Sequence, residues 1–121
     1  MKYMLLIYHD EQAWTKMSEA ERQEIYGEYR QLIGDLSARG QYLAGDQLQL
    51  ANAASSVRVR EGKQIVTDGP FAETREQIGG FFMIEASDLV QATGIAARIP
   101  SARMGLIEIR PVVEESASAA N

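Results

Sequence analysis

The chain has 121 residues, of which 45% are hydrophobic and 24% are charged, and it carries a net charge of −5 with no cysteine. This length fits one domain with a sizeable core, and the lack of cysteine excludes disulfides, thiolate nucleophiles and cysteine-ligated metal centres. The acidic balance argues against a protein that binds the phosphate backbone of nucleic acids. No apolar run approaches the roughly 20 residues that a membrane-spanning helix needs. We therefore expect a cytoplasmic protein that contacts neither nucleic acid nor membrane.

The first third of the chain predicts a strand followed by a long helix. Residues 2–8 read as a strand that is apolar on both faces, so both faces need cover. Residues 10–17 predict a loop. Ser18 and Glu21 have the spacing of a capping box, in which a serine hydroxyl and a glutamate carboxylate satisfy the free amides of a helix start. Gly40 suits the end of that helix.

The rest of the chain predicts short strands and one more helix. In chain order these are a strand at 42–50, a hairpin of strands 57–60 and 64–67 around a tight turn at 61–63, a strand at 79–86, a helix at 88–98 and a strand at 104–110. Ser87 is the predicted cap of the second helix. Residues 114–121 are rich in serine, alanine and glutamate and predict a frayed tail, so the domain is expected to span residues 1–113.

The order of these elements predicts a fold. A β-α-β unit, an inserted hairpin and a second β-α-β unit are typical of the α+β, ferredoxin-like split βαβ arrangement, with two helices on one face of an antiparallel sheet. The other face would then be bare and apolar, which on a soluble protein indicates self-association or a ligand site. We expect a homodimer that packs sheet against sheet, with a pocket on the open sheet face.

One long motif and the two ends of the chain carry a resemblance to a known family. The motif is TDGPFAETREQIGGF at residues 67–81, and the ends are MKYMLLIY at 1–8, IPSAR at 99–103 and EIRPV at 108–112. In these segments the chain resembles the YCII-related, or DGPF-domain, proteins. The resemblance implies a ferredoxin-like domain that dimerises into an α/β barrel, as in muconolactone-isomerase-like proteins. Members are mostly of unassigned function, and some are encoded near alternative sigma factors.

Asp68 and His9 are the candidate catalytic residues. Asp68 follows a predicted strand in the Asp-Gly-Pro turn, where it serves either as a general base or only as a turn residue that bonds its own downstream amides. His9 is the chain's only histidine, and its side chain is the type whose ordinary pKa lies near neutrality. The resemblance implies a His-Asp pair in the smaller relatives, but their histidine lies at the start of the first helix rather than at position 9. The alternative for His9 is a partly exposed residue at a strand end.

Candidate ligand-binding residues surround these two. They are Gly69, Pro70 and Phe71 in the turn, Asp10 beside His9, and Arg103, whose guanidinium suits an anionic ligand. Consecutive residues on an extended chain point in opposite directions, so the run from His9 to Glu11 is not interpreted as a metal site. No organic cofactor is indicated either. Tyr26 and Tyr29 have helical spacing and are interpreted as core or interface residues.

Two functional hypotheses follow. In the first, the protein is a cofactor-independent lyase or isomerase that moves a proton on a small anionic or enol-type ligand. In the second, it is a non-catalytic domain that binds a small ligand or a regulatory partner, with a link to sigma factors as one option. The sequence names no substrate, and a fold alone does not decide between the two.

Overall fold

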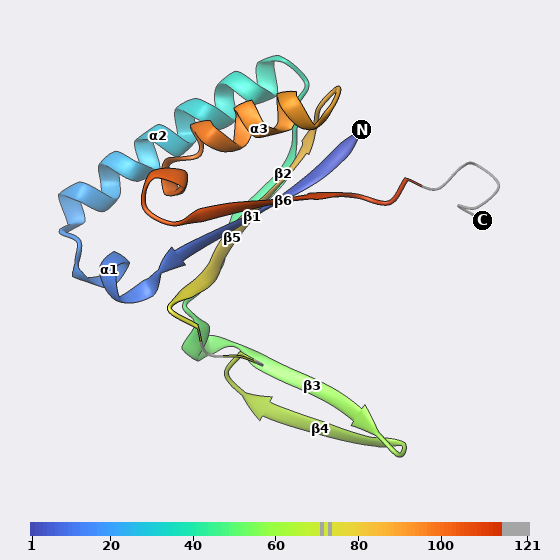
Figure 1. Ribbon diagram of the computed structural model, residues 1–121. Helices are drawn as coiled ribbons and strands as arrows, with labels where there is room; N and C mark the ends of the chain where they lie inside the picture. Colours follow the sequence, from blue (N-terminus) through green and yellow to red (C-terminus); the bar gives the residue numbers. More distant parts are fainter. Residues whose placement is uncertain (71, 73, 115–121) are drawn as a thin grey trace.

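The computed structural model describes residues 1–70, 72 and 74–114, and these form a helix-covered sheet from which a hairpin projects (Figure 1). The main sheet has four antiparallel strands in the order β2-β5-β1-β6. Its strands are β1 (Lys2–Asp10), β2 (Tyr42–Gln47), β5 (Glu76–Glu85) and β6 (Leu106–Pro111). The helices of the described chain are α1 (Glu11–Lys16), α2 (Glu19–Ala38) and α3 (Leu89–Arg98), with the 3-10 turns η1 (Ala51–Ala53) and η2 (Pro100–Arg103). The hairpin strands β3 (Ser55–Arg60) and β4 (Lys63–Asp68) form a separate sheet.

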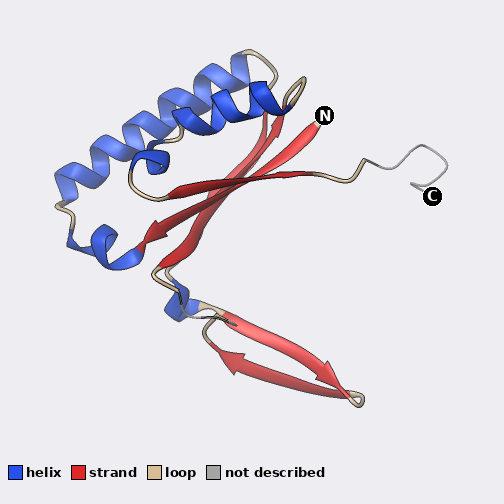
Figure 2. Ribbon diagram, viewed as in Figure 1, coloured by secondary structure: helices blue, strands red, loops and turns tan. Residues whose placement is uncertain are grey.

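This α+β architecture is compatible with the ferredoxin-like arrangement expected from the sequence. Figure 2 shows α2 and α3 together on one side of the four-stranded sheet. The core lies between these helices and the sheet, where Leu5, Ile84, Leu36 and Ile99 have no exposed surface. Burying one such aliphatic side chain stabilises the fold by roughly 1.5–3 kcal/mol.

Strand alternation explains why β1 is apolar on both faces. Tyr3, Leu5 and Ile7 are buried beneath the helices, and the residues between them point to the opposite face. On that open face, Leu6 lies across from Phe81. The open face therefore carries a stripe of partly exposed apolar side chains from three strands: Met4, Leu6, Phe81, Met83 and Leu106.

Helix α2 begins as the sequence predicts. The Ser18 hydroxyl accepts a hydrogen bond from the Glu21 amide at 3.1 Å, and the Glu21 carboxylate accepts one from the Ser18 amide at 3.1 Å. The helix ends at Ala38, shortly before the predicted stop at Gly40. Both halves of the capping box are thus confirmed.

The structure corrects three local predictions. Residues 10–17 are not a loop, because the Asp10 carboxylate accepts hydrogen bonds from the amides of Gln12 at 2.9 Å and Ala13 at 3.3 Å and so begins the short helix α1. The second predicted cap is wrong by one residue, since Asp88 rather than Ser87 accepts from the Gln91 amide at 2.8 Å. Strand β5 also begins three residues before the predicted start at 79.

The predicted hairpin is confirmed, and it stands apart from the main sheet. Glu61 and Gly62 both have positive φ, 52° and 75°, which is typical of the two-residue type I′ turn. Figure 1 shows the hairpin running away from the lower end of the sheet, on the side opposite the helices. Among the described residues, no helix is long and apolar enough to cross a membrane. The predicted tail beyond residue 114 lies outside the described residues.

Candidate functional site

A cavity of about 280 Å³ lies between α2 and the helix-covered face of the sheet. It is not on the open face, where the sequence led us to expect a pocket. We call it the His9 cavity, and the residues that line it are Ile7, His9, Trp14, Tyr26, Tyr29, Ile33, Tyr42, Gly45, Asp46, Gln47, Gly79, Gly80, Phe82 and Ser101. These residues come from β1, α1, α2, β2, β5 and η2, so the cavity depends on the whole fold.

His9 faces the cavity because it shares one face of β1 with Ile7, two residues earlier, and the pairing of β1 with β5 is irregular beside it. Ile7 pairs with Gly80 and Tyr8 pairs with Ile78, so Gly79 is an extra residue that bulges out of the ladder. A Cβ atom on Gly79 would lie 2.7 Å from Cδ2 of the His9 ring, closer than real atoms approach. Glycine at position 79 is therefore what lets the imidazole lie against the β5 backbone.

An aromatic wall continues from the imidazole. The ring of Trp14 lies 5.8 Å from that of His9 between centroids, and Tyr26 meets Trp14 edge-on at 5.7 Å. Such tilted and edge-on contacts are favourable arrangements of aromatic rings. Helix α1, which was not predicted, is the element that places Trp14 here.

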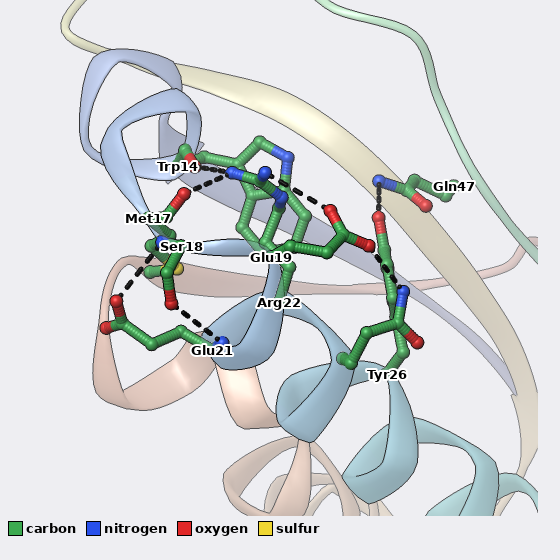
Figure 3. Close-up of polar contacts among 9 residues, drawn as sticks. Trp14, Met17, Ser18, Glu19, Glu21, Arg22, Tyr26 and Gln47 are labelled. Atoms are coloured by element: carbon green, nitrogen blue, oxygen red, sulfur yellow. Dashed lines mark hydrogen bonds and ion pairs between the residues drawn. The ribbon is translucent and has the colours of Figure 1, made fainter.

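Hydrogen bonds fix this wall at the junction of α1 and α2 (Figure 3). The Arg22 guanidinium donates to the carbonyl oxygens of Trp14 at 3.3 Å and Met17 at 2.6 Å, and so ties the end of α1 to α2. Across the cavity, the Gln47 side-chain amide donates to the Tyr26 hydroxyl at 3.2 Å. The ring contact with Trp14 and the hydrogen bond from Gln47 thus fix the position of Tyr26.

The floor of the cavity is more deeply buried. The hydroxyls of Tyr29 and Ser101 share a hydrogen bond of 2.7 Å, and Phe82 packs edge-on against Tyr29 and Tyr42 with centroids 6.0 and 5.2 Å apart. Burial raises the pKa of Tyr29 and of Tyr42, so both phenols stay protonated and can donate hydrogen bonds.

His9 is the titratable group whose behaviour matters most for the chemistry of the cavity. Its partial burial lowers its pKa, an effect that the nearby carboxylates of Glu11 and Asp10 oppose without cancelling. Burial therefore favours the neutral imidazole, in which one ring nitrogen can accept a proton. Among the described residues, no group of three or more His, Asp or Glu side chains is placed to hold a metal ion.

Comparison of the sequence with known proteins identifies the family of this chain. The family model of the YCII-related domain matches residues 1–116. The chain belongs to the YCII-related domain family. An uncharacterized protein of Rhizobium meliloti (strain 1021) is 32% identical to this YCII-related domain over 114 residues, covering 93% of this chain and 92% of that protein.

The structure of this YCII-related domain separates the two candidate catalytic residues. His9 lines the cavity, whereas Asp68 is exposed at the end of β4 and is not among the cavity's lining residues. The amide that follows Asp68 donates to the Ala54 carbonyl at 2.7 Å. The catalytic roles of both residues remain predictions.

The predicted ligand-binding residues fall into different places. Asp10, Gly69 and Pro70 do come together, in a second groove that also involves Thr74 and Arg75. Arg103 instead forms an ion pair of 2.9 Å with Glu28 of α2. Phe71 lies outside the described residues.

Sequence reasoning missed the aromatic part of the YCII-related cavity. Its helical spacing indicates a core or interface role for Tyr26, yet this residue lines the cavity beside Trp14. No local sequence pattern identifies Tyr26 as a cavity residue, because its aromatic neighbour Trp14 lies on α1. The one usable clue was that the chain's only tryptophan follows its only histidine by five residues.

Proposed function

We propose that this YCII-related domain binds a small planar organic molecule in the His9 cavity and moves a proton on it, as a lyase or isomerase without a cofactor. The observation that supports this most is a histidine, whose pKa is lowered by burial, in the wall of an aromatic-lined cavity. A volume of about 280 Å³ is just below the range for ligand pockets, roughly 300–1,000 Å³, and suits only a small ligand.

The lining favours an enol-type ligand over an anion. No lysine or arginine is among the described residues that line the cavity, and its one carboxylate residue, Asp46, would oppose negative charge. Flat aromatic side chains such as Trp14 and Tyr26 suit a flat ligand. The hydroxyls of Tyr26 and Ser101 are polar groups able to bond a carbonyl or enol oxygen.

In the proposed reaction, the neutral His9 imidazole accepts a proton from the carbon next to a carbonyl group. The ligand's oxygen takes up the negative charge, and the Tyr26 hydroxyl is the proposed donor of a hydrogen bond to it. General-base catalysis of this kind contributes about 10²–10⁴-fold to a rate. The sequence favours Asp68 as the residue that transfers the proton, with help from His9, and the position of Asp68 on the hairpin requires a separate test of that role.

The test is proton exchange followed by NMR in D₂O, with a panel of small ketones, enols and phenols. We expect the wild-type protein to accelerate exchange at a carbon next to the carbonyl of one class, and His9→Gln to slow it by about 10²-fold or more. Asp68→Asn, compared in the same assay, shows whether the hairpin carboxylate takes part. An equal exchange rate in wild type and His9→Gln would refute the role of His9.

The alternative is a binding domain that performs no chemistry. It is favoured by one observation: within the described residues, the His9 side chain has no hydrogen bond to a carboxylate that would orient it as a base. In that case His9→Gln would keep its affinity for the ligand, measured by isothermal calorimetry, and no ligand of the panel would exchange protons.

We also propose that two copies pack through their open sheet faces, as a dimeric α/β barrel. The support is the apolar stripe around Leu6 and Phe81, which lies on the side of the sheet that none of the described helices covers, beside Glu108 and Arg110 of β6. Large contiguous apolar patches are rarely left exposed on soluble monomers. The His9 cavity is on the other side of the sheet, so dimerisation does not block it.

A further inference from the structure

Two hydroxyl hydrogens in the His9 cavity have no acceptor among the described residues. The Tyr26 hydroxyl accepts a hydrogen bond from Gln47 at 3.2 Å, which uses its oxygen and leaves its own hydrogen unpaired. The hydroxyls of Tyr29 and Ser101 share one hydrogen bond of 2.7 Å, so only one of their two hydrogens is used. We call these two residues the Tyr29–Ser101 pair. The cavity therefore offers two separate hydrogen-bond donors.

The two donors lie one helical turn apart. Tyr26 and Tyr29 are three residues apart on α2, a spacing at which helical side chains are neighbours with Cβ atoms about 5–6 Å apart. Tyr26 contacts Trp14, whose ring lies 5.8 Å from that of His9, so this donor is near the base. The other donor is bonded to the buried Ser101 of η2. A small ligand that uses both donors needs two acceptor oxygens.

The third phenol of the lining, Tyr42, belongs to the sheet. A Cβ atom on Gly45 would lie 2.6 Å from the Tyr42 hydroxyl oxygen, so this hydroxyl lies against the backbone of β2. Tyr26 and Tyr29 instead project from α2. A flat ligand that lies along α2 therefore meets the Tyr26 hydroxyl and the Tyr29–Ser101 pair.

His9 limits the kind of carbon on which the cavity can act. Burial lowers the pKa of its imidazole, which makes it a weaker base than an ordinary histidine. Proton transfer follows Brønsted behaviour, so a weaker base needs a more acidic carbon. A carbon between two carbonyl groups is far more acidic than a carbon next to one, because its anion shares the charge between two oxygens. The base and the two donors thus favour the same ligand.

We propose that the ligand of the His9 cavity is an uncharged 1,3-dicarbonyl compound, held at one oxygen by Tyr26 and at the other by the Tyr29–Ser101 pair. The C–H bond between the two carbonyls breaks as its proton bonds to the His9 nitrogen, and its electron pair forms the C=C bond of an enolate. The imidazolium then returns the proton to an enolate oxygen, which gives the enol, so no oxidant or second reactant is consumed. This inference rests on the proposed function and narrows its enol-type ligand to one class.

The chain's single tryptophan gives a direct binding measurement, because Trp14 lines the cavity. Its fluorescence is titrated with acetylacetone, a 1,3-dicarbonyl compound, and with 2-pentanone, which has the same carbon chain and one carbonyl group. We expect the wild-type protein to bind acetylacetone about tenfold more tightly, the effect of one additional hydrogen bond. Equal affinity for the two compounds would overturn the proposal.

The variant that tests the second oxygen is Tyr29→Phe/Ser101→Ala. It removes both partners of one buried hydrogen bond and keeps their shape, a change that is nearly neutral for stability. We expect the preference for acetylacetone to fall to about twofold or less, with little change for 2-pentanone. The matched control is Tyr8→Phe, which removes a hydroxyl that bonds Glu108 on the open sheet face and should keep the preference. An unchanged preference in the double variant would overturn the proposal.

The first oxygen is tested with Tyr26→Phe. The Tyr26 hydroxyl is bonded only to the exposed Gln47 within the described chain, so its loss should leave the fold intact. We expect acetylacetone to bind about tenfold more weakly to this variant. An unchanged affinity would refute the attachment of the ligand at two points.

Proton exchange in D₂O separates this inference from the proposed function. Exchange of ketones with one carbonyl that depends on His9, without a binding preference for acetylacetone, would support the proposed function and refute the 1,3-dicarbonyl ligand. A preference that Tyr29→Phe/Ser101→Ala abolishes, without accelerated exchange of any compound, would support the ligand class and refute the proton transfer.

Discussion

Gly79 shows how a single residue sets the geometry of the site. It is the bulged residue of β5, and a Cβ there would collide with the His9 ring. We expect Gly79→Ala to push the imidazole out of the cavity, at a cost of about 1–3 kcal/mol in the free energy of unfolding. Urea denaturation measures that cost, and the His9 pKa measured by NMR should rise toward its usual value of about 6.5 as the ring becomes hydrated.

The matched control is Gly34, which lies in the middle of α2. A Cβ at Gly34 would meet nothing within 4 Å. Gly34→Ala should therefore stabilise the protein by about 0.5–1 kcal/mol, because alanine loses less conformational entropy in a helix. A change of the same sign in both variants would contradict the close approach of His9 to Gly79.

The lowered pKa of His9 predicts how stability depends on pH. The unfolded chain binds the histidine proton with the ordinary pKa of about 6.5, and the folded chain binds it less tightly because burial disfavours the charged ring. Around and just below pH 6.5 the unfolded chain therefore holds more protons, so the stability contributed by His9 rises with pH and is lost on acidification.

We expect wild-type protein to lose more stability than His9→Gln when the pH falls from about 7.5 to about 5.5, as measured by urea denaturation. The single histidine also gives one imidazole signal by NMR. Its titration midpoint should lie below 6.5. A midpoint above 6.5 would show that Asp10 and Glu11 outweigh burial, and the pH dependence would then have the opposite sign.

Helices α2 and α3 show how well the local sequence predicts the residue at which a helix begins. The sequence favours Ser18 and Ser87 as caps, and the structure uses Ser18 and Asp88. Ser18→Ala and Asp88→Ala should each cost about 0.5–2 kcal/mol, because each removes the acceptor for an otherwise free amide. Ser87→Ala should change the unfolding free energy by less than about 0.5 kcal/mol. Denaturation of the three variants compares them, and a larger loss for Ser87→Ala than for Asp88→Ala would contradict the observed cap.

Elements with a long or self-contained pattern were predictable. Helix α2 has a capping box and an apolar stripe within one segment, and the β3–β4 hairpin is closed by its own two-residue turn. Helix α1 was missed because six residues show no period, and its start depends on Asp10 at the end of a strand. The His9 cavity was missed for a related reason. Its lining comes from six elements, and no local sequence pattern predicts that Trp14 and Tyr26 are in contact.

At the scale of the whole molecule, the four-stranded sheet divides the protein into a covered side that holds the His9 cavity and an open side that carries the apolar stripe. The sequence predicted both a bare face and a pocket but assigned them to the same side. Strand alternation shows that β1 has apolar side chains on both of its faces. It does not show which of the two sets of side chains lies beneath the helices. That assignment comes from packing against Leu36 and Ile99.

This division predicts that association and ligand binding can be separated. Leu6→Glu places a second carboxylate directly across from Glu108 on the open face, where a sheet-to-sheet dimer would have to bury two like charges side by side. We expect this variant to be monomeric in sedimentation velocity. Leu89→Glu, at an exposed position on α3, is the matched control and should associate as wild type does.

The monomeric Leu6→Glu protein should keep the His9 cavity, because all of the cavity's lining residues belong to one chain and lie on the other side of the sheet. Its His9 pKa and its affinity for a cavity ligand should therefore match those of wild type. A dimer that persists in Leu6→Glu would refute the open face as the interface. Loss of the ligand together with the dimer would show instead that a second copy completes the site, and would point back to Asp68 on the β3–β4 hairpin.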